Sequence, residues 1–203
     1  MKEKITNGTK LHQLKSLVNK EITGLSSYNL NPKDSDAEVC TMRVVNISDL
    51  SEGVVDYTTV KEMNVRTTKK TEENHIMAGD VLVTLRGTDL RAALVDEKSS
   101  GAVISSNLLA LRLKKTIMPE IVVAWLNSPQ GQQTLNTRSG GGIIQGIKIS
   151  EMMEISVPVP PPEIQREIVD FYKNIQEHRR IIKREEELLE SVEQLYLKTK
   201  LEI

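Results

Sequence analysis

The pattern of apolar and polar residues changes abruptly near residue 160. Before that point, apolar residues come in short runs separated by polar turns, whereas after it one helical stripe continues along the chain. Three prolines, Pro160–Pro162, stand at the change. Each proline fixes φ and lacks a backbone N–H, so the run is tolerated in a first helical turn but not inside a helix or a central strand. The pattern therefore predicts a folded domain over residues 1–159 and a long helix over residues 160–203.

Beyond the prolines, apolar residues recur at alternating steps of three and four residues, which is the heptad spacing of a coiled-coil seam. These seam positions are Ile164, Ile168, Phe171, Ile175, Ile182, Leu189, Val192 and Tyr196. A helix of roughly 38 residues is about 57 Å long at 1.5 Å per residue. One small domain covers only part of such a stripe, so we expect the helix to pair with a second helix. The alternative is a helix that folds back over the surface of its own domain.

The short apolar runs of the first part predict strands mixed with short helices. Strands are expected at residues 39–47, 54–60, 81–85, 92–95, 103–106, 108–113 and 154–159, and helices at residues 11–20, 121–126 and 131–135. Residues 61–74 are highly polar and are expected to form an exposed connection, which is either irregular or partly helical. The elements show no regular β–α–β period, which favours an α+β domain with a twisted sheet that is mixed or mainly antiparallel.

Composition narrows the class of protein. Hydrophobic residues make up 38% of the 203 residues, which is enough for a core, but no run approaches the roughly 20 apolar residues of a membrane span. The N-terminus is polar and lacks the apolar segment of a secretory signal. A single cysteine excludes an internal disulfide and fits a reducing compartment. We therefore expect a cytoplasmic protein without a membrane segment.

The formal net charge of −1 argues against an indiscriminate polyanion binder, but the charges are unevenly distributed. Residues 98–150 contain one acid, Glu120, and six cations: Lys98, Arg112, Lys114, Lys115, Arg138 and Lys148. This excess either forms a basic face or is an ordinary solvated surface that is short of acids. Charge alone does not decide between the two.

Catalytic and metal-binding patterns are missing from the sequence. The histidines His12, His75 and His178 have no partner at a metal-ligand spacing, and a lone Cys40 in an apolar run is typical of a core residue. The glycines at 140–142 lack the lysine and hydroxyl of a phosphate-binding loop. Asp96-Glu97-Lys98 resembles part of a nuclease site, but adjacent side chains point in different directions. We therefore predict no catalytic residue, no metal and no cofactor.

Two polar loops carry the groups that contact nucleic acids. Arginine, glutamine and acidic side chains bind base edges, while serine, lysine and glycine backbone suit phosphates. The candidate DNA-binding residues are Arg86, Thr88, Asp89, Arg91, Arg138, Ser139, Gly140, Gly141, Gln145 and Lys148. Glycine-rich tight turns of any function look similar, so each loop has this second interpretation as well.

Several segments in this order resemble the specificity subunits of type I restriction-modification systems. They are Lys15–Val18 with Gly24, Ala78–Val83 with Arg86-Gly87, Ile104–Asn107, and the block from Gly141 to Ile168. The last block is the most specific, because it joins Gln145-Gly-Ile-Lys-Ile-Ser to Pro-Pro-Pro-Glu-Ile-Gln-Arg-Glu-Ile168. Together the segments cover nearly the whole chain.

The resemblance implies a non-catalytic subunit that recognises double-stranded DNA and holds methyltransferase subunits, which restriction subunits join. It also implies a target-recognition domain whose loops enter a DNA groove, and a helix that packs in an antiparallel coiled coil. Full-length members have two such domains and two helices, whereas this chain has one of each and no internal repeat.

The chain thus looks like a half-length form. Two copies that pair through the helix seam would present identical domains to a palindromic, bipartite target. The alternatives are a separate chain that supplies the second half, or a coiled-coil scaffold without DNA recognition.

Overall fold

The chain divides within its last helix. The computed structural model describes residues 8–34, 38–87, 90–139 and 145–201, and its two compact units are Met1–Gln165 and Arg166–Ile203. The break lies a few residues beyond the proline run, because the first helical turn belongs to the first unit, where Gln165 is buried.

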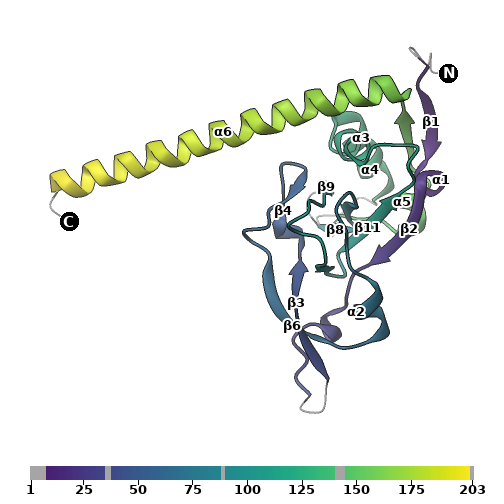
Figure 1. Cartoon of the computed structure of the whole chain (residues 1–203), viewed down its shortest axis with the longest axis horizontal. Coiled ribbons are helices and arrows are strands. Elements are labelled where there is room, and N and C mark those ends of the chain that lie inside the picture. The colour runs from purple at the N-terminus through teal and green to yellow at the C-terminus, as the bar shows by residue number, and fades with distance from the viewer. Residues whose placement is uncertain (1–7, 35–37, 88–89, 140–144, 202–203) are drawn as a thin grey trace. The chain divides into compact units, whose positions relative to one another are not determined.

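A six-stranded sheet forms the centre of the first unit (Figure 1). In spatial order its strands are β2 (Val18–Thr23), β11 (Leu108–Leu113), β7 (Val81–Thr84), β9 (Ala92–Leu94), β5 (Val54–Val55) and β4 (Leu50–Ser51). Neighbouring strands are antiparallel except for β5 and β9. The predicted fold class, α+β with a mixed and mainly antiparallel sheet, is confirmed.

The middle strands of this sheet are apolar on both faces. All four residues of β7 and the first four of β11 are buried, which explains their continuous apolar runs. One core cluster joins Ile22 of β2, Leu82 of β7 and Leu108 of β11 to residues of the flanking loops. These strands are therefore the rigid part of the unit.

Three smaller sheets complete the first unit. They are β10 (Val103–Ile104) with β3 (Val39–Val45) and β6 (Lys61–Arg66), β1 (Lys10–Gln13) with β13 (Ser156–Val159), and β8 (Arg86–Gly87) with β12 (Gln145–Gly146). The first of them encloses a second small core of Leu25, Val44, Val65 and Val103.

The helices of the first unit are short. They are α1 (Leu14–Leu17), α2 (Lys69–Glu73), α3 (Pro119–Leu126), α4 (Pro129–Arg138) and α5 (Ile149–Met153), with 3₁₀ turns at Ser27–Asn29 and Ile47–Asp49. Proline begins α3 and α4, where its missing N–H has no helical partner anyway. The hydroxyl of Ser128 caps α4 by accepting from the Gly131 N–H at 3.2 Å. These caps place the helix starts close to where the sequence predicts them.

The helix predicted at residues 11–20 is wrong. Only α1 is helical there, because β1 pairs with β13 and β2 pairs with β11 on either side of it. Sheet pairing therefore overrides the helical spacing of the apolar residues. Gly24 follows β2 so closely against the chain that a Cβ atom would lie 1.9 Å from the Ser105 carbonyl oxygen.

The polar segment at residues 61–74 differs in part from its prediction. Helix α2 agrees with the partly helical alternative, whereas β6 was not predicted, because half of its side chains are exposed and it shows no apolar pattern. The expected strand at residues 54–60 shortens to β5, and α5 was not predicted.

Gln165 fastens the start of the last helix within the first unit. Its side chain is only 4% exposed. Its Oε1 accepts from the Met118 N–H at 2.8 Å, and its Nε2 donates to the carbonyl of Pro160 at 2.9 Å and more weakly to that of Thr116 at 3.4 Å. One buried amide thus joins the helix start, the proline run and the loop before α3.

Replacing Gln165 with Leu is expected to lower the free energy of unfolding by about 2 kcal/mol, because the partly buried Met118 N–H and two carbonyls lose their partner. Thermal and urea unfolding measure the change. The same substitution at the exposed Gln133 is the matched control and should shift stability little. Equal stability of the two variants would contradict the fastening role of Gln165.

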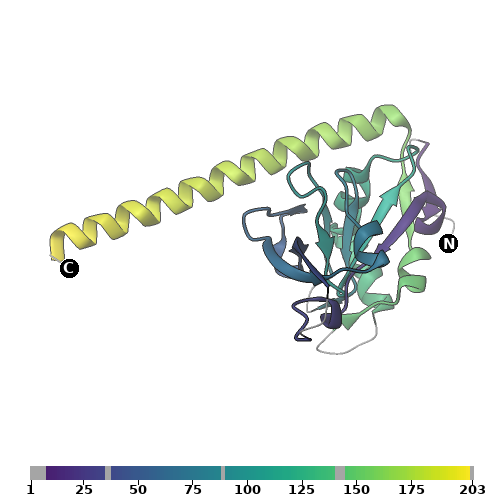
Figure 2. The same cartoon turned by 60° about the horizontal axis from the view of Figure 1, so that its bottom comes forward.

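The last helix, α6 (Pro162–Leu201), is 40 residues long, as its heptad pattern predicts (Figure 2). In the single chain, seam residues of the second unit remain exposed, with Phe171 at 68%, Ile182 at 55% and Leu189 at 69%. Ile164 lies in the first unit and is half-buried. Within the described part of the chain, no helix combines the length and apolarity that a bilayer span requires.

Candidate nucleic-acid interface

Two polar segments that lie far apart in the sequence meet in one antiparallel ribbon. Strand β8 pairs with β12, with Arg86 opposite Gly146 and Gly87 opposite Gln145. The Ile147 N–H extends the pairing by donating to the Leu85 carbonyl at 2.9 Å. The fold thus unites the two loops that the sequence singles out as candidates for DNA contact.

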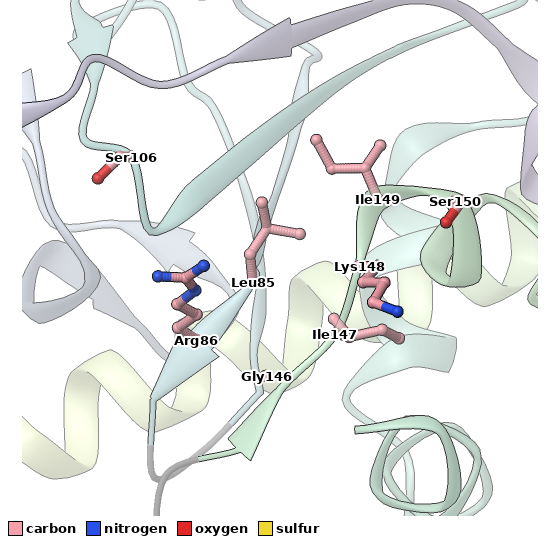
Figure 3. Close-up of a pocket in the computed structure, with 8 residues that line it drawn as sticks. All are labelled: Leu85, Arg86, Ser106, Gly146, Ile147, Lys148, Ile149 and Ser150. Carbon is pink, nitrogen blue, oxygen red and sulfur yellow. The ribbon is translucent and has the colours of Figure 1, made fainter. Parts of the chain in front are cut away.

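A hollow of about 650 Å³ lies beside this ribbon (Figure 3). It is lined by Leu85, Arg86, Ser106, Gly146, Ile147, Lys148, Ile149 and Ser150. We call this hollow the ribbon pocket. The core strands β7 and β11 fix the position of the pocket, because Leu85 and Arg86 directly follow β7 and Ser106 shortly precedes β11.

Both cations of the ribbon pocket face solvent. The Arg86 side chain is exposed and has no hydrogen-bond or ion-pair partner among the residues that the structure describes. The Lys148 side chain is 82% exposed, and its ammonium lies 4.0 Å from a carboxylate oxygen of Glu151. An exposed pair at that distance contributes little energy, so both cations stay available to an anion.

Two other candidates near the ribbon bind neighbouring protein groups. Arg138 ends α4, where its guanidinium lies 3.7 Å from a Glu154 carboxylate oxygen and donates at 3.5 Å to the Glu151 carbonyl. Ser139 is only 5% exposed and its hydroxyl donates to the Asn136 carbonyl. Its own carbonyl accepts from the Gly146 N–H at 3.3 Å. Ser139 therefore supports the ribbon and, in this state, presents no hydroxyl to a ligand.

Arg91 does not line the ribbon pocket. Its guanidinium donates to the Leu50 carbonyl at 3.3 Å, and its backbone N–H donates to the Thr84 hydroxyl at 2.7 Å. These bonds give Arg91 a part in joining β4 to the segment between β7 and β9. Thr88, Asp89, Gly140 and Gly141 lie outside the described residues, and of Gln145 only the backbone in β12 is described.

Several cations of the acid-poor stretch at residues 98–150 bind groups of the protein itself. The guanidinium of Arg112 forms a two-pronged ion pair with Asp80, with distances of 2.9 Å and 2.8 Å. The ammonium of Lys114 donates to the Ser16 carbonyl at 2.8 Å. Of the six cations, only Lys148 lines the ribbon pocket. The interpretation as a surface short of acids is the better one.

Potential catalytic groups take structural roles. Cys40 is half-buried, and its thiol lies 3.7 Å from the Val65 carbonyl oxygen. A ring nitrogen of His75 lies 2.9 Å from the Gly101 carbonyl oxygen. The Asp96 carboxylate accepts from the Ser99 N–H. Across residues 8–34, 38–87, 90–139 and 145–201, no group of three or more His, Cys, Asp or Glu side chains is placed to hold a metal ion.

Of the eight residues that line the ribbon pocket, sequence reasoning named only Arg86 and Lys148 as DNA-binding candidates. Leu85, Ser106, Ile149 and Ser150 carry no signal of their own, because strand pairing alone brings them to the ribbon. Ser106, Ile149 and Ser150 had an indirect signal, since they belong to the segments Ile104–Asn107 and Gly141–Ile168 on which the family resemblance partly rests.

Comparison with known proteins points to one family. The family described as "Type I restriction modification DNA specificity domain" matches residues 11–191. The EcoBI specificity subunit of a type I restriction enzyme from Escherichia coli is 23% identical over 128 residues, which are 63% of this chain and 27% of that protein.

Solved structures show the same fold. The HsdS subunit from Thermoanaerobacter tengcongensis superposes with a TM-score of 0.61 at 18% identity, over 90% of this chain and 41% of that one. A chain from a study of complex assembly in a type I R-M system gives a TM-score of 0.62 at 19% identity, over 90% and 42%. The chain therefore spans less than half the length of these relatives.

Proposed function

Because the chain belongs to the family of type I restriction modification DNA specificity domains, we propose that its first unit recognises a specific sequence of double-stranded DNA. The observation that carries this proposal is the β8–β12 ribbon, which unites two polar loops at a solvent-facing pocket with two cations. Such a ribbon fits the major groove, and its flanking cations suit the phosphates beside that groove.

The proposed DNA-binding residues differ in how much structural support each has. Arg86 and Lys148 have the strongest support because they line the ribbon pocket and are exposed. Arg138 contacts DNA only after it exchanges its bonds to Glu151 and Glu154 for a phosphate or a base edge. Base reading is assigned to the loops at residues 88–89 and 140–145, whose amide, hydroxyl and carboxylate groups match base edges.

The second unit is proposed to pair with the α6 helix of a second copy of the chain. The exposed seam supports this pairing, since isolated amphipathic helices bury such a stripe against a partner. The seam residues proposed for the interface are Ile168, Phe171, Ile175, Ile182, Leu189, Val192 and Tyr196, with Ile164 at the domain end.

The charges of α6 favour an antiparallel pair. A basic segment at residues 179–184 contains four cations and is followed by an acidic segment at residues 185–193 that contains five glutamates. Parallel helices would set like charges against each other, whereas antiparallel helices that cross near the boundary bring each basic segment close to an acidic one. Two recognition domains would then sit at opposite ends of the pair and read a palindromic target in two parts.

As part of such an assembly, the chain would supply recognition rather than catalysis. We propose that methyltransferase subunits and restriction subunits dock on it, in the cytoplasm, and that the chain itself uses no cofactor. The family match supports these partners.

A second candidate function is a coiled-coil scaffold that has lost DNA recognition, which the net charge of −1 favours. Selection of bound duplexes from a random library separates the two. An enriched sequence motif is expected if the first unit reads DNA, and the absence of any motif would leave the scaffold as the better account.

A further inference from the structure

Resting on the proposed DNA recognition, we propose that the ribbon pocket clamps the backbone of one DNA strand. Two successive phosphates would occupy its two ends, with the deoxyribose between them. The pocket would then hold the duplex in position without reading a base. This assigns Arg86 and Lys148 a positioning role and leaves sequence reading to the neighbouring loops.

The lining of the pocket has two polar ends and an apolar middle. Figure 3 shows Arg86 and Ser106 on one side, Lys148 and Ser150 on the other, and Leu85 between them. Each end thus offers one cation and one hydroxyl, the two kinds of side chain that commonly contact phosphate oxygens. The middle offers aliphatic side chains, which suit the uncharged face of a sugar. A phosphate–sugar–phosphate unit has this same order of properties.

The size and openness of the pocket suit a polymer better than a lone ion. Its volume of about 650 Å³ falls within the range of sites for organic ligands, and a single phosphate would leave much of it empty. Arg86, Gly146, Lys148 and Ser150 are all exposed at its rim. A DNA strand can therefore enter the pocket at one end and leave it at the other.

The side chains that line the ribbon pocket favour contact with the DNA backbone over contact with a base. Among the side chains that the structure describes, the lining contains no Asn, Gln, Asp or Glu, so it lacks the pairs that specify adenine and cytosine. Gly146 has no side chain, so a sugar or phosphate can approach its backbone closely. Sequence-independent contacts of this kind fix register and orientation on the duplex.

The test compares Arg86→Ala, Lys148→Ala and the double variant with the wild-type chain. Affinity is measured across a salt series for two probes, the most enriched selected duplex and a pool of random-sequence duplexes. We expect each single variant to weaken binding to both probes by about tenfold and to reduce the slope of log K against log [salt] by about 1. The ratio of the two affinities should stay unchanged.

Lys61→Ala is the matched control, because Lys61 is exposed on β6 outside the pocket and should leave both measurements unchanged. Thermal unfolding checks that each variant is folded. An altered base preference in the Arg86 or Lys148 variant would overturn the clamp, as would unchanged affinity and slope. Wild-type protein that binds both probes equally would contradict the proposed sequence recognition. The clamp would still stand if the variants bind more weakly and show a smaller slope of log K against log [salt]. If wild type binds neither probe, both proposals fail.

Discussion

Replacing Ile182 and Leu189 together with aspartate is expected to convert a dimer of the chain into a monomer. Both side chains lie on the α6 seam and are exposed by 55% and 69% in the single chain. In a two-fold pair, the substitutions would bury four carboxylates, each of which must lose its hydration without a partner. A penalty of about 4 kcal/mol already corresponds to a thousandfold weaker association, so the dissociation constant should rise by at least about that factor.

Sedimentation velocity over a range of concentrations measures this change. The matched control is Ser191→Asp with Gln194→Asp, which adds the same charge to the same part of α6 at exposed polar positions away from the seam. The control should remain a dimer. A wild-type chain that sediments as a monomer at high concentration would contradict pairing between copies, and so would a seam variant that still sediments as a dimer.

The second large effect is expected at Asp80, whose replacement with Ala should lower the free energy of unfolding by about 3–5 kcal/mol. The Asp80 side chain is 2% exposed and accepts from Arg112 at 2.8 Å and 2.9 Å and from the Met77 N–H at 2.8 Å. These side-chain hydrogen bonds raise the pKa of Arg112. Without Asp80, the Arg112 guanidinium, 26% exposed, would lose its counter-charge, and the Met77 N–H would lose its acceptor.

Loss of Asp80 is also expected to disturb the ribbon pocket. Asp80 immediately precedes β7 and Arg112 lies in β11, so the ion pair joins the two strands whose other ends lead to Arg86 and Ser106. Urea unfolding measures the stability change, and duplex binding should fall with it. Asp96→Ala is the control, because Asp96 is exposed and its carboxylate accepts from the backbone N–H of the nearby Ser99. If both variants lose a comparable amount of stability, the Asp80–Arg112 ion pair does not make the large contribution to stability that we expect.

Sequence patterns succeeded where one physical cause determines the structure. Val81–Thr84 and Leu108–Leu111 are buried by neighbours on both faces, so their apolar runs predict strands directly. Likewise, the heptad spacing after Pro162 predicts α6, because a single stripe repeats without interruption by glycine or proline. The order of motifs then predicted the family, which the match over residues 11–191 confirms.

Prediction failed where distant pairing determines local structure. Lys10–Gln13 becomes a strand because it meets Ser156–Val159, which no local window of sequence contains. Lys61–Arg66 is too polar to show a strand pattern, yet it pairs along β3. The candidate site shows the same limit, since the two loops were identified one at a time and only the β8–β12 pairing joins them into a pocket. Burial, which removed Ser139 from the exposed candidates, is also a tertiary property.

The most direct test of the account is the symmetry of the DNA motif that the intact chain selects from a random duplex library. We expect a palindrome of two identical arms separated by a gap of constant length, since the proposed pair of helices would hold two copies of one recognition domain. The Ile182→Asp, Leu189→Asp variant should select a single arm or lose selection. Failure of the wild-type chain to enrich any motif, or enrichment of one continuous motif without two-fold symmetry, would contradict it.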